Sequence, residues 1–162
     1  MQHADEMKRI GDLIKDIRIT MLVTLDSRDQ PRSRPMATQS VPFDGVLWFF
    51  TSKDSSQVSE ISRRPHVNLA YSSPSSESYL SVTGTASVLD DRQKIHELWS
   101  PFLRSWFESA DDPTIRLLRI DVDEVEYWDT PGGKVASLYS LVKGAITGKT
   151  DEKPGEHQKV VL

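Results

Sequence analysis

The chain has 162 residues, a formal net charge of −4 at pH 7, a pI near 5.6 and no cysteine. This length suits one domain and is too short for two, while the acidic balance without any Lys/Arg run excludes a surface that binds nucleic-acid backbones. Without cysteine the chain has no disulfide, thiolate nucleophile or Cys-ligated metal, which fits a reducing cytoplasm.

The first predicted element is an amphipathic helix at the N-terminus. Apolar residues recur there at helical spacing on an otherwise charged segment: Met7, Ile10, Leu13, Ile14 and Ile17. Charges are mixed along this segment, and no stretch of the chain approaches about 18 consecutive apolar residues. We therefore expect neither a cleaved signal peptide nor a membrane span, and a cytoplasmic protein.

After this helix the apolar pattern changes to a period of two, which predicts a half-buried strand over 19–25. The polar turn at 26–31 returns the chain as an antiparallel partner over 32–39. A second reversal at 42–45 leads into 46–51, an apolar run rich in β-formers and typical of a central strand.

The middle of the chain predicts one helix between strands. A short helix is expected over 54–64, where Pro65 ends it. Alternation resumes over 66–72 and again over 79–90, the longest strand candidate. Gly84 in the middle of that strand indicates a bend or a close approach of two backbones.

The last third alternates between helix and strand. A wide stripe of apolar and aromatic side chains predicts a covering helix after residue 91, kinked near Pro101. Residues 114–130 return to strand, and 135–146 show helical spacing. The polar residues 147–162 are predicted to form a disordered tail.

These elements predict a mainly β fold. About six antiparallel strands joined by hairpins indicate a closed or nearly closed barrel, with helices over its openings. We find no internal repeat and no interdomain linker, so residues 1–146 are expected to form a single domain.

The stretch WFFTSKDSSQVSEI, residues 48–61, joins an aromatic strand directly to a helix start. Helix N-termini bind anions through free backbone N–H groups, and Arg34 on the neighbouring strand can grip a phosphate with two N–H groups. Hydroxyl and ammonium groups surround the helix start: Thr51, Ser52, Lys53 and Ser56. The aromatic residues 48–50 provide a flat wall for a ring. A ligand with a ring and a phosphate fits this pattern, although the same residue types also occur in ordinary loops and caps.

Five blocks, in order, resemble successive segments of a known family: TLDSRDQPRSRPM, LWFFTSKDSSQVSEI, VNLAYSSPSSESYLSVTGTASVLDD, LWSPFLRSWFESADDP and LLRIDVDEVEYWD. Over roughly residues 10–146 the chain resembles the general-stress-protein branch of the pyridoxamine 5'-phosphate oxidase-like flavoproteins. The resemblance implies a split β-barrel homodimer that binds FMN, or the related FAD, at the subunit interface. It also implies a small-molecule electron donor or acceptor.

The resemblance, together with the helix start, yields the expected cofactor-binding residues. It directs Arg34 to the flavin phosphate, and Trp128 to the flavin of the other subunit. The full predicted set is Arg34, Pro35, Met36, Ala37, Thr38, Phe50, Thr51, Ser52, Lys53, Ser56, Gln57 and Trp128. The chain departs from the family at Gln57, where a basic residue is usual. Where the oxidase carries basic residues for its substrate phosphate, this chain has Lys134 and then the apolar Leu138, so turnover of pyridoxamine phosphate is not expected.

The sequence offers no convincing general acid or base, and its four scattered histidines predict no metal site. The chemistry would then be that of the flavin itself. One hypothesis is an FMN-dependent oxidoreductase linked to stress. A second is a non-catalytic protein that binds or sequesters flavin, and a third is a barrel that has lost its ligand and works through partner contacts.

Overall fold

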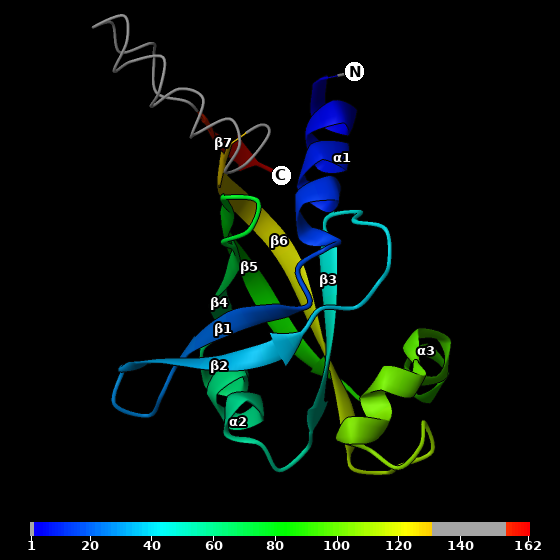
Figure 1. Cartoon of the computed structure of the whole chain (residues 1–162). Helices are drawn as coiled ribbons and strands as arrows, with labels where there is room; N and C mark the ends of the chain where they lie inside the picture. The colour runs from blue at the N-terminus through cyan, green and yellow to red at the C-terminus, as the bar shows by residue number, and fades with distance from the viewer. Residues whose placement is uncertain (1, 131–154) are drawn as a thin grey trace, which may run out of the picture.

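The computed structural model describes residues 2–130 and 155–162 (Figure 1). Seven strands form one antiparallel sheet in the order β2-β1-β4-β5-β6-β3, and β7 pairs with β6. The strands are β1 (Ile19–Leu25), β2 (Pro31–Ala37), β3 (Val46–Ser52), β4 (His66–Ser73), β5 (Ser78–Leu89), β6 (Ile115–Asp129) and β7 (Glu156–Val161). The helical elements are α1 (Gln2–Ile14), α2 (Ser56–Arg63), α3 (Arg92–Leu98) and the 3-10 turn η1 (Pro101–Ser105).

The sheet is an open barrel, and its opening is a seam between two strands. Strands β2 and β3 are the two ends of the strand order, and they lie in contact without pairing in the described part of the chain. The predicted mainly β, antiparallel fold is confirmed, with one strand more than expected.

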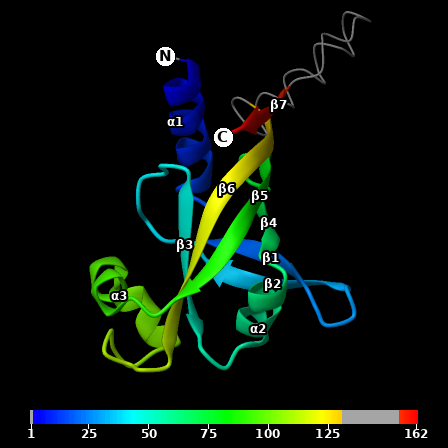
Figure 2. The same cartoon turned by 180° about the vertical axis from the view of Figure 1, so that it is seen from behind.

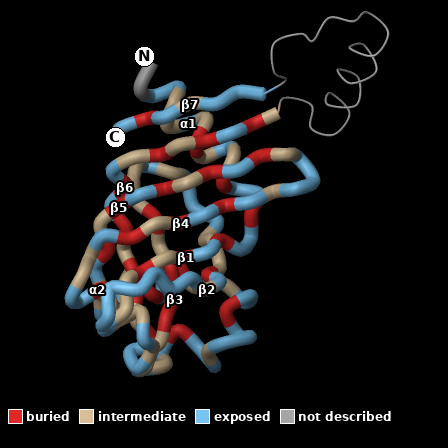
Figure 3. The backbone as a smooth tube through the Cα atoms, turned by 90° about the vertical axis from the view of Figure 1, so that its left-hand side faces the viewer, coloured by how far each residue is buried: buried red, intermediate tan, exposed pale blue. Residues whose placement is uncertain are grey.

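Alternating side chains explain why the sheet curls around a core. Along β5, buried residues such as Leu80 and Val82 alternate with exposed or half-buried ones, as Figure 3 shows for the neighbouring strands. Leu22, Leu69 and Ile120 on other strands are also fully buried. Each such side chain contributes about 1.5–3 kcal/mol, so period-two burial stabilises this fold.

The helices cover the two ends of the barrel. Figures 1 and 2 show α1 at one end and both α2 and α3 at the other. Ile10 and Ile14 anchor α1 in the main core, as their helical spacing predicted. The predicted kinked helix is two elements, because the chain leaves helical geometry at Trp99 before Pro101 opens η1. None of the helices in the described ranges is long and apolar enough to cross a membrane.

Gly84 marks the close backbone approach that the sequence predicted. The register between β5 and β6 shifts between Thr83 and Gly84. A Cβ atom at Gly84 would lie 2.5 Å from the carbonyl oxygen of Asp121, closer than any real contact. Only glycine therefore fits this bulge.

The prediction of a disordered tail over 147–162 is wrong for its last part. Residues Glu156–Val161 form β7, which pairs with β6 and buries Val160. Arg9 of α1 contacts the carboxylates of Asp129 and Glu156, so the two ends of the described chain are joined. Residues 147–154 and the predicted helix over 135–146, with Lys134 and Leu138, lie outside the described residues.

Candidate functional site

A cavity of about 510 Å³ lies at the seam between the free edges of β2 and β3, and we call it the seam cavity. Strand β2 contributes Pro35, Met36 and Ala37, while β3 contributes the stretch Phe50–Ser52. Edge strands carry backbone N–H and C=O groups without a strand partner. The walls of the seam cavity therefore offer main-chain hydrogen bonds as well as side chains.

One end of the seam cavity is polar because α2 begins there. Gln57 Nε2 donates to Thr51 Oγ1 at 2.8 Å, and Thr51 Oγ1 lies 2.7 Å from Ser55 Oγ. Ser55 is the N-cap of α2, but its side chain caps no N–H group of the described helix. The first turn thus keeps backbone donors and the positive end of the helix dipole for an anion.

The other end of the seam cavity is aromatic and apolar. The ring of Phe50 lies 6.5 Å from that of Phe107, and Leu103 is fully buried beside them. Trp106 also lines the cavity and is 56% exposed. A cavity with hydroxyl donors at one end and aromatic walls at the other suits a ligand with an anionic group and a flat ring.

The structure gathers more than half of the residues that the sequence predicted. The seam cavity is lined by these members of the predicted set: Pro35, Met36, Ala37, Phe50, Thr51, Ser52 and Gln57. Lys53 and Ser56 are exposed and do not line it, and Ser55 supplies the hydroxyl at the helix start instead. Thr38 lines neighbouring cavities.

Arg34 has a different environment from the one that the sequence predicted. Its Nη2 lies 2.8 Å from Glu60 Oε2 on α2, and its Nη1 donates to Thr24 Oγ1 at 2.6 Å. Arg34 does not line the seam cavity. Its guanidinium group instead fastens α2 to the β1–β2 hairpin, and direct contact with a phosphate remains a prediction.

Trp128 does not line the seam cavity of its own chain. It occupies the opposite end of β6 from Ile115, which pairs with Ser52 at the polar end of the cavity. The indole is 40% exposed and stacks on His157 with ring centroids 5.1 Å apart. The predicted contact of Trp128 with the flavin of another subunit remains a prediction.

Sequence reasoning missed the aromatic contribution of η1 to this site. The stripe of apolar and aromatic side chains after residue 91 predicts a covering helix, and it gives no sign that these side chains line a cavity. Trp106 and Leu103 instead line the seam cavity together with Gln39 and Ile19. The available signal was Pro101, which breaks the helix and turns the following side chains toward another surface.

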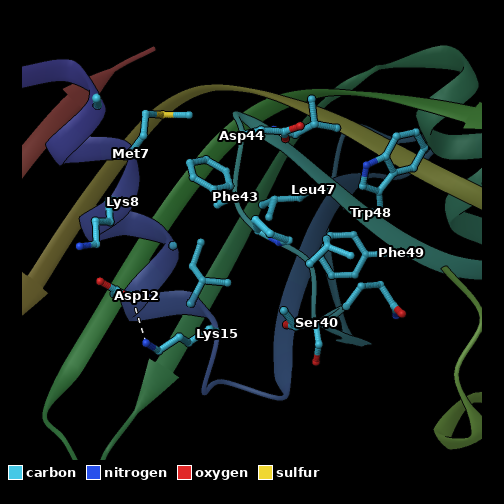
Figure 4. Close-up of a pocket in the computed structure, with 18 residues that line it drawn as sticks. Met7, Lys8, Asp12, Lys15, Ser40, Phe43, Asp44, Leu47, Trp48 and Phe49 are labelled. Carbon is cyan, nitrogen blue, oxygen red and sulfur yellow. Dashed lines mark hydrogen bonds and ion pairs between the residues drawn. The ribbon is translucent and has the colours of Figure 1, made fainter. Parts of the chain in front are cut away.

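A larger cavity of about 690 Å³ lies between α1, the segment 38–44 and the start of β3 (Figure 4). Met7, Phe43 and Leu47 form its apolar wall. Lys15 beside Asp12 lowers the pKa of that carboxyl group, and their ion pair spans 2.9 Å. Of the predicted cofactor-binding residues, only Thr38 lines this larger cavity. The described residues of the larger cavity include no cluster of hydroxyl donors at a helix start. The seam cavity is thus the better candidate for a ligand with an anionic group.

The described residues around the seam cavity include no cluster of metal-ligating side chains. Within residues 2–130 and 155–162, no three His, Asp or Glu side chains lie close enough together to hold a metal ion. None of the described residues lining the seam cavity carries a carboxylate, an imidazole or an ammonium group. These residues can bind and orient a ligand, but they offer no general acid or base.

Comparisons of the sequence find a family and a relative that are similar to this chain. A sequence model for the family described as "Pyridoxamine 5'-phosphate oxidase like" matches residues 5–152. General stress protein 26 of Bacillus subtilis is 26% identical over 129 residues, which cover 77% of this chain and 89% of that protein.

Solved structures share the fold. A protein described as general stress protein 26, from Jannaschia sp. CCS1, matches with a TM-score of 0.81 and 28% identity over 98% of this chain and 99% of that one. The general stress FMN/FAD binding protein from Xanthomonas citri matches with a TM-score of 0.68 and 29% identity, over 78% and 89% of the two chains.

Proposed function

Because the chain belongs to the pyridoxamine 5'-phosphate oxidase-like family, we propose that it is a general stress protein that binds FMN in the seam cavity. The observation that carries this proposal is the junction of a hydroxyl-rich helix start with an aromatic pocket at two free strand edges. The similar Xanthomonas citri protein is described as FMN/FAD binding, which supports a flavin as the ligand.

The residues of the seam cavity fit the two parts of FMN. The phosphate would be held by Thr51, Ser55 and the first backbone N–H groups of α2. The flat ring would lie between Phe50 and Trp106, with the edge of β2 offering hydrogen bonds to its polar rim. Bound flavin supplies hydride and electron transfer.

We propose that the protein is an oxidoreductase that uses the bound flavin as its cofactor. The chain's own residues would bind the cofactor, orient it and exclude water through the buried Leu103 and Phe50. A non-catalytic flavin-binding protein is the second candidate, and the lack of any titratable side chain in the described cavity wall favours it. Anaerobic mixing of the flavin-loaded protein with NADH or NADPH, followed by exposure to air, distinguishes the two candidates. An oxidoreductase predicts that the bound flavin is rapidly reduced and then reoxidised. A non-catalytic flavin-binding protein predicts neither change.

A homodimer would complete the site. The outer face of the sheet carries a row of exposed apolar residues that includes Ile19, Met21, Tyr79 and Trp128. Tyr79 and Trp128 are direct neighbours on β5 and β6, while Ile19 also lines the seam cavity. We propose that a second copy covers this face and brings its Trp128 to the cavity. We place the dimer in the cytoplasm, as the cysteine-free composition suits a reducing compartment.

Equilibrium titration with FMN, FAD and riboflavin, followed by flavin fluorescence, tests the proposed ligand. A phosphate site predicts that FMN binds at least tenfold tighter than riboflavin, which corresponds to about 1.4 kcal/mol. Tighter binding of FAD than of FMN would change the assigned cofactor. Equal affinity for FMN and riboflavin would remove the phosphate site, and a lack of binding by all three would overturn the proposed function.

A further inference from the structure

A second cavity of about 340 Å³ adjoins the seam cavity. Gln39 lines both cavities. Three further pairs of consecutive residues separate the two cavities. In each pair the first residue named lines the second cavity and the other lines the seam cavity: Arg18 and Ile19, Thr38 and Ala37, and Phe102 and Leu103. The shared walls lie at the aromatic end of the seam cavity, away from Thr51 and the start of α2. A ligand in the second cavity would therefore lie beside the ring end of a ligand in the seam cavity.

The second cavity has an uncompensated positive charge. Arg18 takes part in none of the ion pairs formed by the described residues, and its guanidinium carbon lies 5.8 Å from the ring centroid of Phe102. Glu97 on the same cavity is paired with Lys94, with the charged atoms 3.0 Å apart. The negative charge of Glu97 is thus already matched, while the N–H groups of Arg18 are available to a carboxylate.

Two exposed aromatic side chains join the cavities. Phe102 is 46% exposed and meets Trp106 edge to face, with ring centroids 5.1 Å apart at 71°. Phe102 faces the second cavity, and Trp106 the seam cavity. An exposed aromatic pair of this kind gives a ring a surface on which to stack.

We propose that the second cavity is a subsite for a planar aromatic carboxylate, whose ring packs on Phe102 and whose carboxylate pairs with Arg18. We further propose that the ligand of this subsite exchanges electrons with the flavin. This role rests on the proposed function, since the ligand lies beside a redox-active ring only if flavin occupies the seam cavity. The binding itself depends on Arg18 and Phe102 and needs no flavin.

Calorimetric titration of the full chain with 2-naphthoate and with 2-naphthamide tests the subsite, because the two compounds share a ring system and differ in charge. We expect 2-naphthoate to bind at least tenfold tighter than 2-naphthamide. Arg18→Gln should abolish this preference. Arg28→Gln is the matched control, since Arg28 is exposed on the β1–β2 turn, and it should retain the preference. Phe102→Ala should weaken the binding of both compounds.

Equal affinity for the two compounds, or a preference that survives Arg18→Gln, would overturn the subsite. Repeating the titration after adding FMN separates this proposal from the proposed function. A protein that binds FMN but shows no preference for 2-naphthoate contradicts the subsite alone. A protein that shows the preference but binds no flavin contradicts the proposed function and leaves the subsite standing.

Discussion

Arg34 and Glu60 form an ion pair with 2.8 Å between Nη2 and Oε2, and this pair joins strand β2 to helix α2. Thr24 completes the cluster, since it accepts a hydrogen bond from Arg34 and donates one to Glu60. The side chains of Arg34 and Glu60 are only 18% and 12% exposed. Because the first turn of α2 forms the polar end of the seam cavity, this pair holds the proposed phosphate site in place.

Arg34→Ala and Glu60→Ala should each lower the free energy of unfolding by about 1–2 kcal/mol, because each leaves a partly buried charge without its partner. The double variant should lose less free energy of unfolding than the sum of the two single variants, since each single substitution already breaks the same ion pair. Urea denaturation measures these values. Arg32→Ala, which breaks the more exposed pair with Asp26, is the control and should change stability little.

FMN affinity of the same variants separates two roles for Arg34. If Arg34 acts by positioning α2, both Arg34→Ala and Glu60→Ala should weaken FMN binding. If Arg34 contacts the phosphate directly, Glu60→Ala should release its guanidinium group and leave FMN affinity unchanged or higher.

Gln57→Lys should strengthen FMN binding by about 1–2 kcal/mol without strengthening riboflavin binding. Gln57 is the second residue of α2, and its side chain lines the seam cavity. An ammonium group at this position would therefore add a charge-assisted contact to a phosphate. Parallel titrations with both flavins measure the effect, and Ser59→Lys on the exposed side of α2 is the control. An equal gain for riboflavin, or none for FMN, would place the phosphate elsewhere.

Tyr71→Phe should change stability at pH 7 by less than about 1 kcal/mol, because the buried hydroxyl has no hydrogen-bond partner among the described residues. Burial raises the pKa of Tyr71 above its ordinary value of 10.0, and the neighbouring Thr38 hydroxyl opposes this shift only in part. The folded state thus holds the proton more tightly than the unfolded state. The contribution of protonated Tyr71 to the free energy of unfolding is complete below pH 10, the pKa of an unfolded tyrosine. This contribution is lost as the pH rises toward the higher pKa of the folded state.

Urea denaturation at pH 7 and pH 11 measures this alkaline loss. Wild type should lose more stability than Tyr71→Phe between the two values. Tyr79→Phe, at an exposed position, should behave like wild type. If Tyr71→Phe lost as much stability as wild type, another group would be responsible.

Trp128→Ala should weaken both the dimer and the binding of FMN, the dimer by about 2 kcal/mol, because a large exposed indole on an apolar face is a typical interface anchor. Sedimentation equilibrium and flavin titration on the same preparation measure the two effects. Val161→Ala, at an exposed position on β7, is the control. A Trp128→Ala protein that remained dimeric and bound FMN normally would remove Trp128 from the site.

Most of the sheet could be predicted because side-chain alternation reports directly on burial. The strands from Ile19 to Asp129 and the bulge at Gly84 follow from local patterns of this kind. Strand β7 could not be predicted in the same way. Its short pattern lies in a polar segment, and its pairing depends on β6 and on contacts such as Arg9 with Glu156, far away in the sequence.

The site shows the same division. The end of β3, at Ser52, and the start of α2 could be located to within two residues because both have local signals. The partner of Arg34 could not, since Glu60 is one of many carboxylates in the chain and only the fold brings the two together. The position of Trp106 on the cavity likewise depends on how η1 packs against the seam.

A crystal structure of the protein grown with FMN tests the central claim most directly. We predict that the phosphate lies within hydrogen-bond distance of Thr51, Ser55 and the first turn of α2, with the ring beside Phe50. A flavin bound instead in the larger cavity beneath α1, beside Met7 and Phe43, would contradict the assignment of the seam cavity.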